Sequence, residues 1–147
     1  MIKRIDHIAI LLPDLAGGTS FWVDALGLPL EKTEQMPEQQ VEIAFLPVGD
    51  SHIELLEPTD DASGVAAYLR KRGPGLHHIC LEVDDIEATL ARLKEADIPL
   101  IDEEPKISED GKQLAFIHPK GTGGVLVELY QYPNLTKNES DNHLHGP

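Results

Sequence analysis

An internal repeat is the feature of this sequence that most limits what the chain can fold into. Four short, mostly apolar segments of the first half recur in the same order in the second half. The pairs are residues 6–15 with 77–86, 28–30 with 98–100, 43–46 with 114–117, and 53–56 with 127–130. The offset is 70 or 71 residues until the last pair, where a three-residue insertion raises it to 74. A constant order at a nearly constant offset indicates two copies of one structural unit.

Each copy reads as one strand, one helix and three further strands. The first strands are the short apolar, β-branched runs Ile5–Leu12 and His77–Val83. The further strands are predicted near residues 29–33, 41–47, 52–56, 100–103, 113–118 and 125–131. The chain is therefore predicted to be an α+β protein made of two tandem βαβββ modules.

Each predicted helix has a capping residue at its start. In the first copy Asp14 is the predicted cap, and Leu15, Trp22 and Leu26 lie on one helical face that would pack on the sheet. In the second copy Asp84 is the predicted cap, as the first residue of a capping box whose carboxylate accepts an orphan amide.

The repeat also predicts the domain organisation. Residues 1–134 are expected to form a single domain, with the first module at about residues 4–58 and the second at about 76–133. A linker helix is predicted at about residues 60–73, because Gly73-Pro74-Gly75 would end a helix there. Residues 135–147 are polar and are predicted to form a disordered tail.

The charge balance argues against some partners. The chain carries 26 acidic residues against 12 basic ones, a formal net charge of −14. Neither nucleic acid nor an anionic membrane is expected as a partner, because both require a basic face on the protein.

Two features favour a cytoplasmic location. Cys80 is the only cysteine in the sequence, so no intramolecular disulfide can form and a reducing compartment is permitted. The apolar run Ile8–Leu12 is too short for a signal-peptide core or a membrane span. We therefore expect a cytoplasmic protein.

Metal-coordinating side chains occupy equivalent places in the two copies. His7 and His78 lie in the first strands, and Glu54 and Glu128 lie in the last strands. Both glutamates interrupt apolar runs, where a charge needs either water or a partner. If a pseudo-twofold axis relates the copies, the four side chains converge on it. Two imidazoles and two carboxylates suit Zn, Co, Ni or Mn, so one divalent ion is predicted there.

Two neighbouring histidines are weaker candidates. His77 is expected to face away from His78, because side chains alternate along a strand. His52 shares the strand face of Glu54, but the other copy has no histidine at the corresponding place.

Glu42 is a candidate for proton transfer. It alternates with Ile43 and is expected to face the cup between the modules, whereas its repeat partner is the non-ionisable Gln113. An asymmetric carboxylate beside a metal site is what a proton-transfer reaction needs. The alternative is a solvent-facing glutamate at the start of a strand.

These residues resemble the vicinal oxygen chelate superfamily, which includes glyoxalases, extradiol dioxygenases and fosfomycin-resistance proteins. Within it the chain is most similar to the methylmalonyl-CoA epimerase family. The resemblance spans roughly residues 5 to 133 and rests on residues 5–10, 53–58, 73–83, 116–120 and 124–129. It implies a glyoxalase-like fold, in which the two modules form a cupped eight-stranded mixed sheet around a metal site.

The resemblance also implies an activity and a set of site residues. The family's metal ligands fall on His7, Glu54, His78 and Glu128, and its proton-handling carboxylates fall on Glu42 and Glu128. The implied reaction interconverts (R)- and (S)-methylmalonyl-CoA by removing and returning the α-proton through a metal-stabilised enolate. The implied partner is an acyl-CoA thioester, and a homodimer is expected.

Two other functions stay open at this point. Some epimerases have glutamine where this chain has Glu54, and a set of two histidines and two glutamates is also the glyoxalase pattern. The first alternative is therefore a glyoxalase-type lactoylglutathione lyase. The second is a non-catalytic metal-binding or small-molecule-binding protein of the same superfamily, which would leave Glu42 without a role.

Overall fold

A computed structural model of the chain describes residues 1–134, and the tail predicted for residues 135–147 lies outside this range. The strands are β1 (Ile2–Leu11), β2 (Lys32–Met36), β3 (Val41–Val48), β4 (Ser51–Pro58), β5 (Gly75–Val83), β6 (Lys106–Ile107), β7 (Gln113–Ile117) and β8 (Val127–Gln131). The helices are α1 (Leu15–Thr19), continued by the π-helical stretch η1 (Ser20–Ala25), α2 (Gly64–Arg72), α3 (Ile86–Glu95) and the 3₁₀ turn η2 (Pro119–Gly121). Across residues 1–134 none of these helices is long and apolar enough to cross a membrane.

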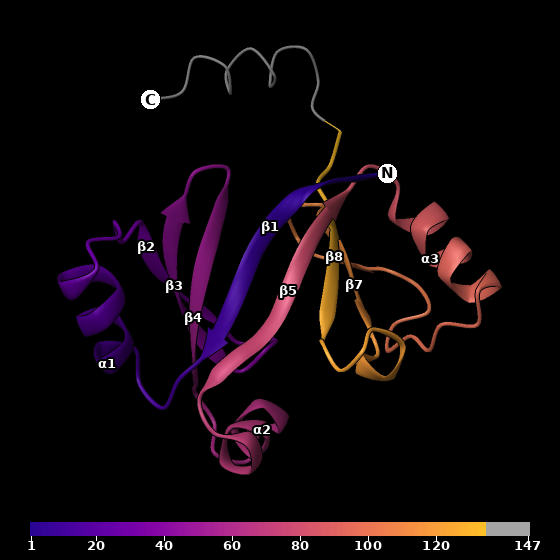
Figure 1. Cartoon of the computed structure of the whole chain (residues 1–147). Helices are drawn as coiled ribbons and strands as arrows, with labels where there is room; N and C mark the ends of the chain where they lie inside the picture. Colours follow the sequence, from indigo (N-terminus) through magenta and orange to yellow (C-terminus); the bar gives the residue numbers. More distant parts are fainter. Residues whose placement is uncertain (135–147) are drawn as a thin grey trace.

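The strands form one sheet whose order is symmetric about its centre. The order is β2-β3-β4-β1-β5-β8-β7-β6. β1 and β5 pair antiparallel in the middle, and each pairs in parallel with the last long strand of its own module, β4 or β8. Figure 1 shows β1 and β5 side by side between α1 and α3. The predicted α+β fold, two βαβββ modules in one cupped mixed sheet, is confirmed, whereas the domain bounds stay a prediction.

The two outer helices decide which face of the sheet carries the site. Leu55, which follows Glu54 on β4, packs with Leu15 of α1 in one apolar cluster. Leu129, which follows Glu128 on β8, packs in a second cluster beneath α3. Because side chains alternate along a strand, both glutamates point to the opposite, concave face. Burial of these leucines contributes about 1.5–3 kcal/mol each and so fixes this orientation.

Three predicted strands differ most from their observed positions. β1 begins three residues earlier than predicted, β2 begins three residues later, and residues 100–103 form no regular strand. Leu100 makes only an isolated bridge with Ile117. The reason is Asp102, whose Oδ2 accepts the backbone N–H of Phe116 at 2.8 Å in place of a strand carbonyl.

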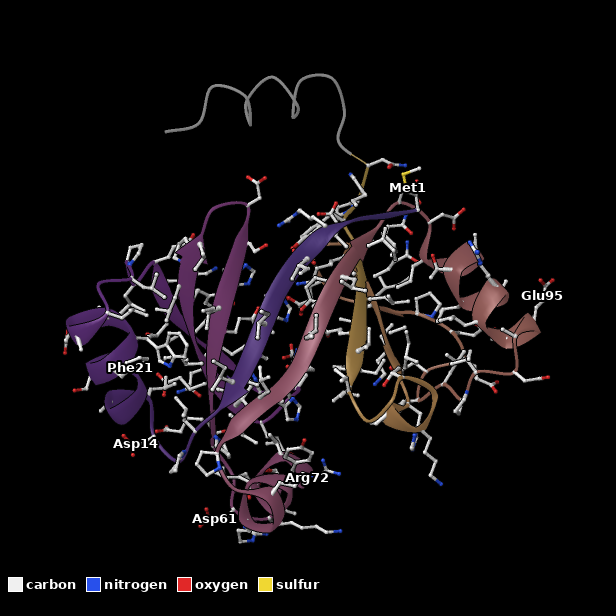
Figure 2. The ribbon with its side chains drawn as sticks, viewed as in Figure 1. Met1, Asp14, Phe21, Asp61, Arg72 and Glu95 are labelled. Carbon is white, nitrogen blue, oxygen red and sulfur yellow. The ribbon has the colours of Figure 1, made fainter. Side chains whose placement is uncertain are left out.

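One helix cap is confirmed and the other needs correction. Asp14 caps α1, and its Oδ1 accepts from Gly17 N at 2.6 Å. The cap of α3 is Asp85 rather than Asp84, because Asp85 Oδ1 accepts from Ala88 N at 3.0 Å. Asp84 instead accepts from the N-terminal amine of Met1 at 2.6 Å. Figure 2 shows Met1 beside the loop that leads into α3.

The predicted apolar stripe of the first helix is right for Leu15 and Trp22 but wrong for Leu26, which is 55% exposed. The cause is η1, where Leu26 N donates to Phe21 O, five residues earlier. A π-helical turn holds more residues than an α-helical turn, so the α-helical period does not continue through it.

Candidate metal and catalytic site

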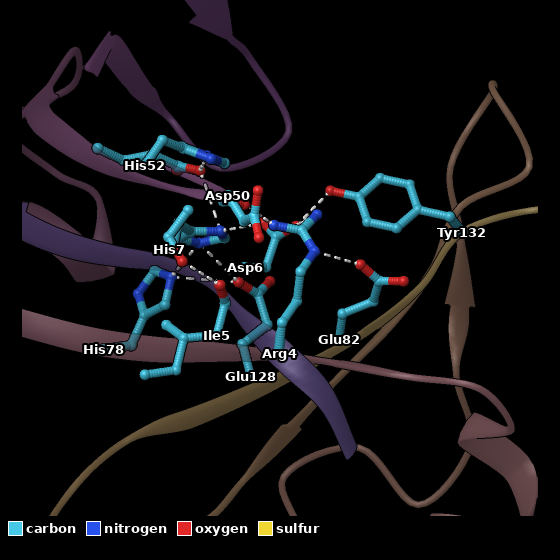
Figure 3. Close-up of polar contacts among 12 residues, drawn as sticks. Arg4, Ile5, Asp6, His7, Asp50, His52, His78, Glu82, Glu128 and Tyr132 are labelled. Atoms are coloured by element: carbon cyan, nitrogen blue, oxygen red, sulfur yellow. Dashed lines mark hydrogen bonds and ion pairs between the residues drawn. The ribbon is translucent and has the colours of Figure 1, made fainter. Parts of the chain in front are cut away.

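Three of the four predicted metal ligands converge on the concave face of the sheet. His7 Nε2 lies 3.1 Å from His78 Nε2 and 3.4 Å from Glu128 Oε1. His78 Nε2 lies 3.1 Å from the same glutamate oxygen. All three side chains are buried, and Figure 3 shows them facing one another. We call His7, His78 and Glu128 the central triad.

The separations within the central triad fit a divalent ion. Donor atoms about 2.1 Å from one ion, at angles of about 90–109°, lie about 3.0–3.4 Å from one another. The three separations in the triad, 3.1, 3.1 and 3.4 Å, agree with this geometry. Two imidazole nitrogens and one carboxylate oxygen also suit borderline first-row metals. The residues present therefore fit the predicted ion.

Glu54 lies beside the central triad rather than within it. Its Oε2 is 3.1 Å from His7 Nδ1, the ring nitrogen that does not face the triad, and 2.8 Å from His52 Nε2. The ring of His52 stacks on that of His7 with centroids 5.1 Å apart. The structure thus brings Glu54 to His7 and His52 but not to the Nε2 atoms of the central triad, and its coordination of the ion stays a prediction.

Asp6 is a site residue that the sequence prediction missed. It is fully buried, and its Oδ2 accepts from His7 Nδ1 at 2.7 Å. Its Oδ1 accepts from the Tyr132 hydroxyl at 2.6 Å and from Arg4 at 3.0 Å. Burial favours a higher pKa for Asp6, but the hydrogen bonds from His7 and Tyr132 lower it. The available signal was an acid directly before a histidine in an apolar strand.

The two central strands carry irregularities directly before the triad histidines. In the β1–β5 ladder, Asp6 and His77 have no pairing partner, because the register shifts by one residue at each of them. Such bulges re-aim side chains and are common next to active sites. As a result His77 Nδ1 lies 2.8 Å from His78 Nδ1. The prediction that His77 faces away from His78 is wrong, because strict alternation does not hold across a bulge.

Glu42 does not face the cup in this structure. It pairs with Glu57 across the β3–β4 ladder. Glu57 Oε1 accepts from Leu15 N at the start of α1, at 3.0 Å, so this register position lies on the α1 side of the sheet. Ile43 lines the concave face in its place. The predicted orientation of Glu42 is therefore wrong in this structure, whereas its role in proton transfer stays a separate prediction.

The central triad adjoins a cavity of about 420 Å³. Ile43, Phe45 and Tyr130 supply apolar walls, and His78 and Glu128 reach its interior. Two segments border it from corresponding places in the two modules, residues 36–39 and residues 108–110. The cavity thus combines apolar walls with ionisable groups, which reach it both from the central triad and from the rim.

The family comparisons agree with this geometry. The sequence model of the Glyoxalase/Bleomycin resistance protein/Dioxygenase superfamily matches residues 6–116. The chain belongs to this superfamily. It is 42% identical over 131 residues to human mitochondrial methylmalonyl-CoA epimerase, covering 88% of this chain and 74% of the relative. It is 41% identical over 133 residues to the ethylmalonyl-CoA/methylmalonyl-CoA epimerase of Cereibacter sphaeroides, covering 89% and 99%.

A solved structure supports the same assignment for this superfamily member. The structure of a methylmalonyl-CoA epimerase in complex with methylmalonyl-CoA and NH4+ has a TM-score of 0.79 at 35% identity. The match covers 90% of this chain and 96% of that chain. The predicted resemblance to the methylmalonyl-CoA epimerases and the glyoxalase-like fold are confirmed. The superfamily is metal-dependent, and in this member two groups of potential ligands that include His7 have ligand atoms within 4.8 Å of one another.

His7 carries a proton in this structure, and an ion bound by its Nε2 would displace that proton. Desolvation favours a lower pKa for His7, but the hydrogen bonds to Asp6 and Glu128 and the charges of Glu54 and Glu128 raise it to about 9. Desolvation favours a higher pKa for Glu128, but the hydrogen bonds from His7 and His78 lower it to about 2. Below about pH 9 metal binding would therefore release a proton from His7.

We expect the stability of the metal-free protein to fall on both sides of a plateau between about pH 4.5 and 6.5. The pKa of His7 is raised from 6.5, so its contribution is complete below pH 6.5 and is lost as the pH rises through about 9. The pKa of Glu128 is lowered from 4.5, so its contribution is complete above pH 4.5 and is lost as the pH falls through about 2. Urea unfolding of chelator-treated protein at each pH measures this profile.

The matched control for this profile is Glu128→Gln, which removes one charge of the pair. Its free energy of unfolding should depend less on pH at both ends of the range. The same pH dependence in the variant and the wild-type protein would contradict the role given to the His7–Glu128 pair.

Proposed function

We propose that this superfamily member is a metal-dependent methylmalonyl-CoA epimerase that interconverts the (R) and (S) forms of its substrate. The observation that carries the proposal is the buried central triad beside a cavity of about 420 Å³. Identities of 41 and 42% to proteins named as epimerases, over 88 to 89% of this chain, support it. The structure of a relative in complex with methylmalonyl-CoA supports an acyl-CoA thioester as the substrate.

The central triad is proposed to bind one divalent ion, with Glu54 as the fourth ligand. The triad geometry supports the first three ligands. Burial of Glu54 and its place in the repeat, equivalent to that of Glu128, support the fourth. The donor set admits Zn, Co, Mn or Ni. A bound ion would supply positive charge to stabilise the negative charge that develops on the thioester oxygen as the α-proton leaves.

The protein's own carboxylates are proposed to move the proton. Glu128 is ionised at neutral pH because its hydrogen bonds with His7 and His78 lower its pKa to about 2. Glu128 is proposed to remove and return the proton on one face of the planar enolate. Glu42 is proposed to do the same on the opposite face. Each general acid or base of this kind typically raises the reaction rate by about 10²- to 10⁴-fold.

For this role the side chain of Glu42 must turn from the α1 side of β3 to the cavity side. Glu42 is the second residue of β3 and follows a turn in which Gln40 has a φ of +56°. A β-bulge at this end of the strand would re-aim one side chain and leave Ile43 and Phe45 in place. The sequence resemblance to the epimerase family, in which a proton-handling carboxylate falls at the position of Glu42, supports its assignment as a base.

Two lysines at the cavity are proposed to attract the anionic groups of the substrate. Lys32 Nζ lies 4.8 Å from the centroid of the Phe45 ring, and Lys112 Nζ lies 4.3 Å from that of Tyr130. Both lysines line the cavity. Stacking on the rings holds the two charges at the cavity wall in an otherwise acidic protein.

The function is tested by comparing two substrates. Metal-loaded protein is incubated with a single isomer of methylmalonyl-CoA and, separately, with methylglyoxal and glutathione. We expect the first substrate to become a mixture of isomers and the second to stay unchanged. Turnover of the glutathione adduct alone would identify a lyase. Metal binding without turnover of either substrate would identify a binding protein.

We propose that the chain forms a homodimer through the outer face of β1 and β5. Ile2, Ile5 and Leu76 are 49, 46 and 68% exposed. Each pairs in the β1–β5 ladder with a residue that packs in or against the apolar cluster under α1 or α3. Because paired side chains point to the same side of a sheet, all three lie on the outer face, which is the face that carries α1 and α3 and is opposite the cavity. In Figure 1 neither helix lies across these two strands.

Light scattering after size-exclusion chromatography tests this dimer. The wild-type protein is expected to have twice the mass of one chain, and Ile5→Asp is expected to shift it toward the monomer, because a charge on an apolar interface is costly. A monomeric wild-type protein would contradict the proposal.

A cytoplasmic location is also proposed. The buried free thiol of Cys80 supports it, because a reducing compartment preserves thiols. Cell fractionation tests it, and recovery of the protein in a secreted fraction would contradict it.

A further inference from the structure

Asp6 and His77 occupy the same position in the repeat and make the same kind of contact. Each directly precedes a triad histidine, and each sits where the β1–β5 register shifts by one residue. Asp6 Oδ2 lies 2.7 Å from His7 Nδ1, and His77 Nδ1 lies 2.8 Å from His78 Nδ1. The pseudo-twofold symmetry therefore extends beyond the triad to the group behind each histidine.

The contact behind His78 has one consistent proton arrangement. A histidine that offers Nε2 to an ion carries its proton on Nδ1. For His7 this proton is donated to the carboxylate of Asp6, which can only accept. His78 Nε2 faces the triad, so its Nδ1–H donates to Nδ1 of His77. The neutral ring of His77 then carries its own proton on Nε2.

We propose that His77 is a positioning residue, which fixes the tautomer and ring orientation of His78 as Asp6 does for His7. Both Nε2 lone pairs are then directed at the same point, where they lie 3.1 Å apart. Such partners behind a ligand commonly change metal affinity by about 10- to 100-fold when they are removed. The inference rests on the metal site of the proposed function but not on its substrate.

The linker helix holds His77 in place. The ring of Tyr68 on α2 packs edge-on against the ring of His77, with centroids 4.9 Å apart. Tyr68 in turn packs against buried residues of the first module. The helix between the modules thus connects the core of the first module to a metal ligand of the second.

His7 and His78 also differ in the group that accepts their Nδ1 proton. An ionised carboxylate polarises an Nδ1–H more strongly than a neutral imidazole does, so His7 is the stronger donor to an ion. A His77→Asp substitution would give His78 the same support as His7 has.

Metal affinity tests this role in the full-length protein. Co²⁺ is bound in competition with a chromophoric chelator at one fixed pH. His77→Phe keeps a ring against Tyr68 but removes the acceptor, and its Kd should rise about 10- to 100-fold. His77→Asn places an amide oxygen where Nδ1 was and should restore most of the affinity. The control is His118→Gln, because His118 Nδ1 accepts from Lys120 N in η2, outside the triad, and this variant should bind Co²⁺ as the wild-type protein does.

A second readout needs no variant. ¹⁵N spectra of the wild-type protein loaded with diamagnetic Zn²⁺ should show a proton on Nδ1 of His78, because its Nε2 would then face the ion. The proposal is overturned if Nδ1 of His78 carries no proton in the Zn²⁺-loaded protein. It is also overturned if a folded His77→Phe variant binds Co²⁺ as tightly as the wild-type protein, or if His77→Asn loses as much affinity as His77→Phe. If His77→Phe does not fold, the tautomer decides. Neither measurement uses a thioester substrate. A protein without epimerase activity could therefore still confirm or contradict the role of His77.

Discussion

Replacing Glu128 with glutamine is expected to weaken metal binding strongly and to stop α-proton exchange. The amide keeps the shape of the side chain, but it is neutral and a poor ligand. His7 and His78 would lose the carboxylate that lies 3.4 and 3.1 Å from their Nε2 atoms. The metal Kd should rise by more than the 10- to 100-fold typical of a group behind a ligand. Exchange at saturating metal should fall about 10²- to 10⁴-fold, measured as deuterium incorporated into methylmalonyl-CoA.

Glu57→Gln is the matched control for this substitution. Glu57 lies on the same sheet but on the α1 side, where it accepts from Leu15 N. Glutamine preserves that acceptor, so metal affinity and exchange should equal those of the wild-type protein. Exchange by Glu128→Gln within tenfold of the wild-type rate at saturating metal would contradict its role in proton transfer, and an unchanged metal Kd would contradict its role as a ligand.

Glu42→Gln is expected to separate proton transfer from metal binding. Glu42 is outside the central triad, so the metal Kd should stay unchanged. If Glu42 serves the second face of the enolate, exchange should fall about 10²- to 10⁴-fold at saturating metal. The two measurements are the same as for Glu128→Gln, so the two variants can be compared directly.

Glu38→Gln is the informative comparison for Glu42. Glu38 lines the cavity from the exposed rim, whereas Glu42 lies on the other side of the sheet in this structure. We expect Glu38→Gln to change exchange by no more than a few-fold, below the effect of a general acid or base. The opposite pattern, with Glu42→Gln active and Glu38→Gln inactive, would show that the second base belongs to the rim.

The repeat was sufficient to predict the two modules, and three of the four side chains that it predicted to converge do so. Equivalent residues of two fused copies meet near the axis between the copies, and this geometry applies to His7, His78 and Glu128 without knowledge of any contact. The groups behind the histidines could not be predicted in this way. Asp6 and His77 turn toward them because the β1–β5 register shifts, and the register depends on two strands rather than on the sequence of one.

The orientation of Glu42 was unpredictable for a different reason. β3 is buried on both faces, since Ile43 and Ala44 are 3 and 0% exposed. A strand with two apolar faces gives no periodic signal for which face is concave. The sequence order places Glu42 beside the site but does not decide the side of the sheet on which its carboxylate lies.

The account depends most on the claim that one ion held by the central triad supports α-proton exchange. The direct measurement titrates metal-free protein with Co²⁺ in D₂O in the presence of methylmalonyl-CoA and follows deuterium at the α-carbon. We predict no exchange in the chelated protein and a rate that rises with added ion and levels off at one ion per chain. An equal rate in the chelated protein, or full metal occupancy without deuterium incorporation, would contradict the account.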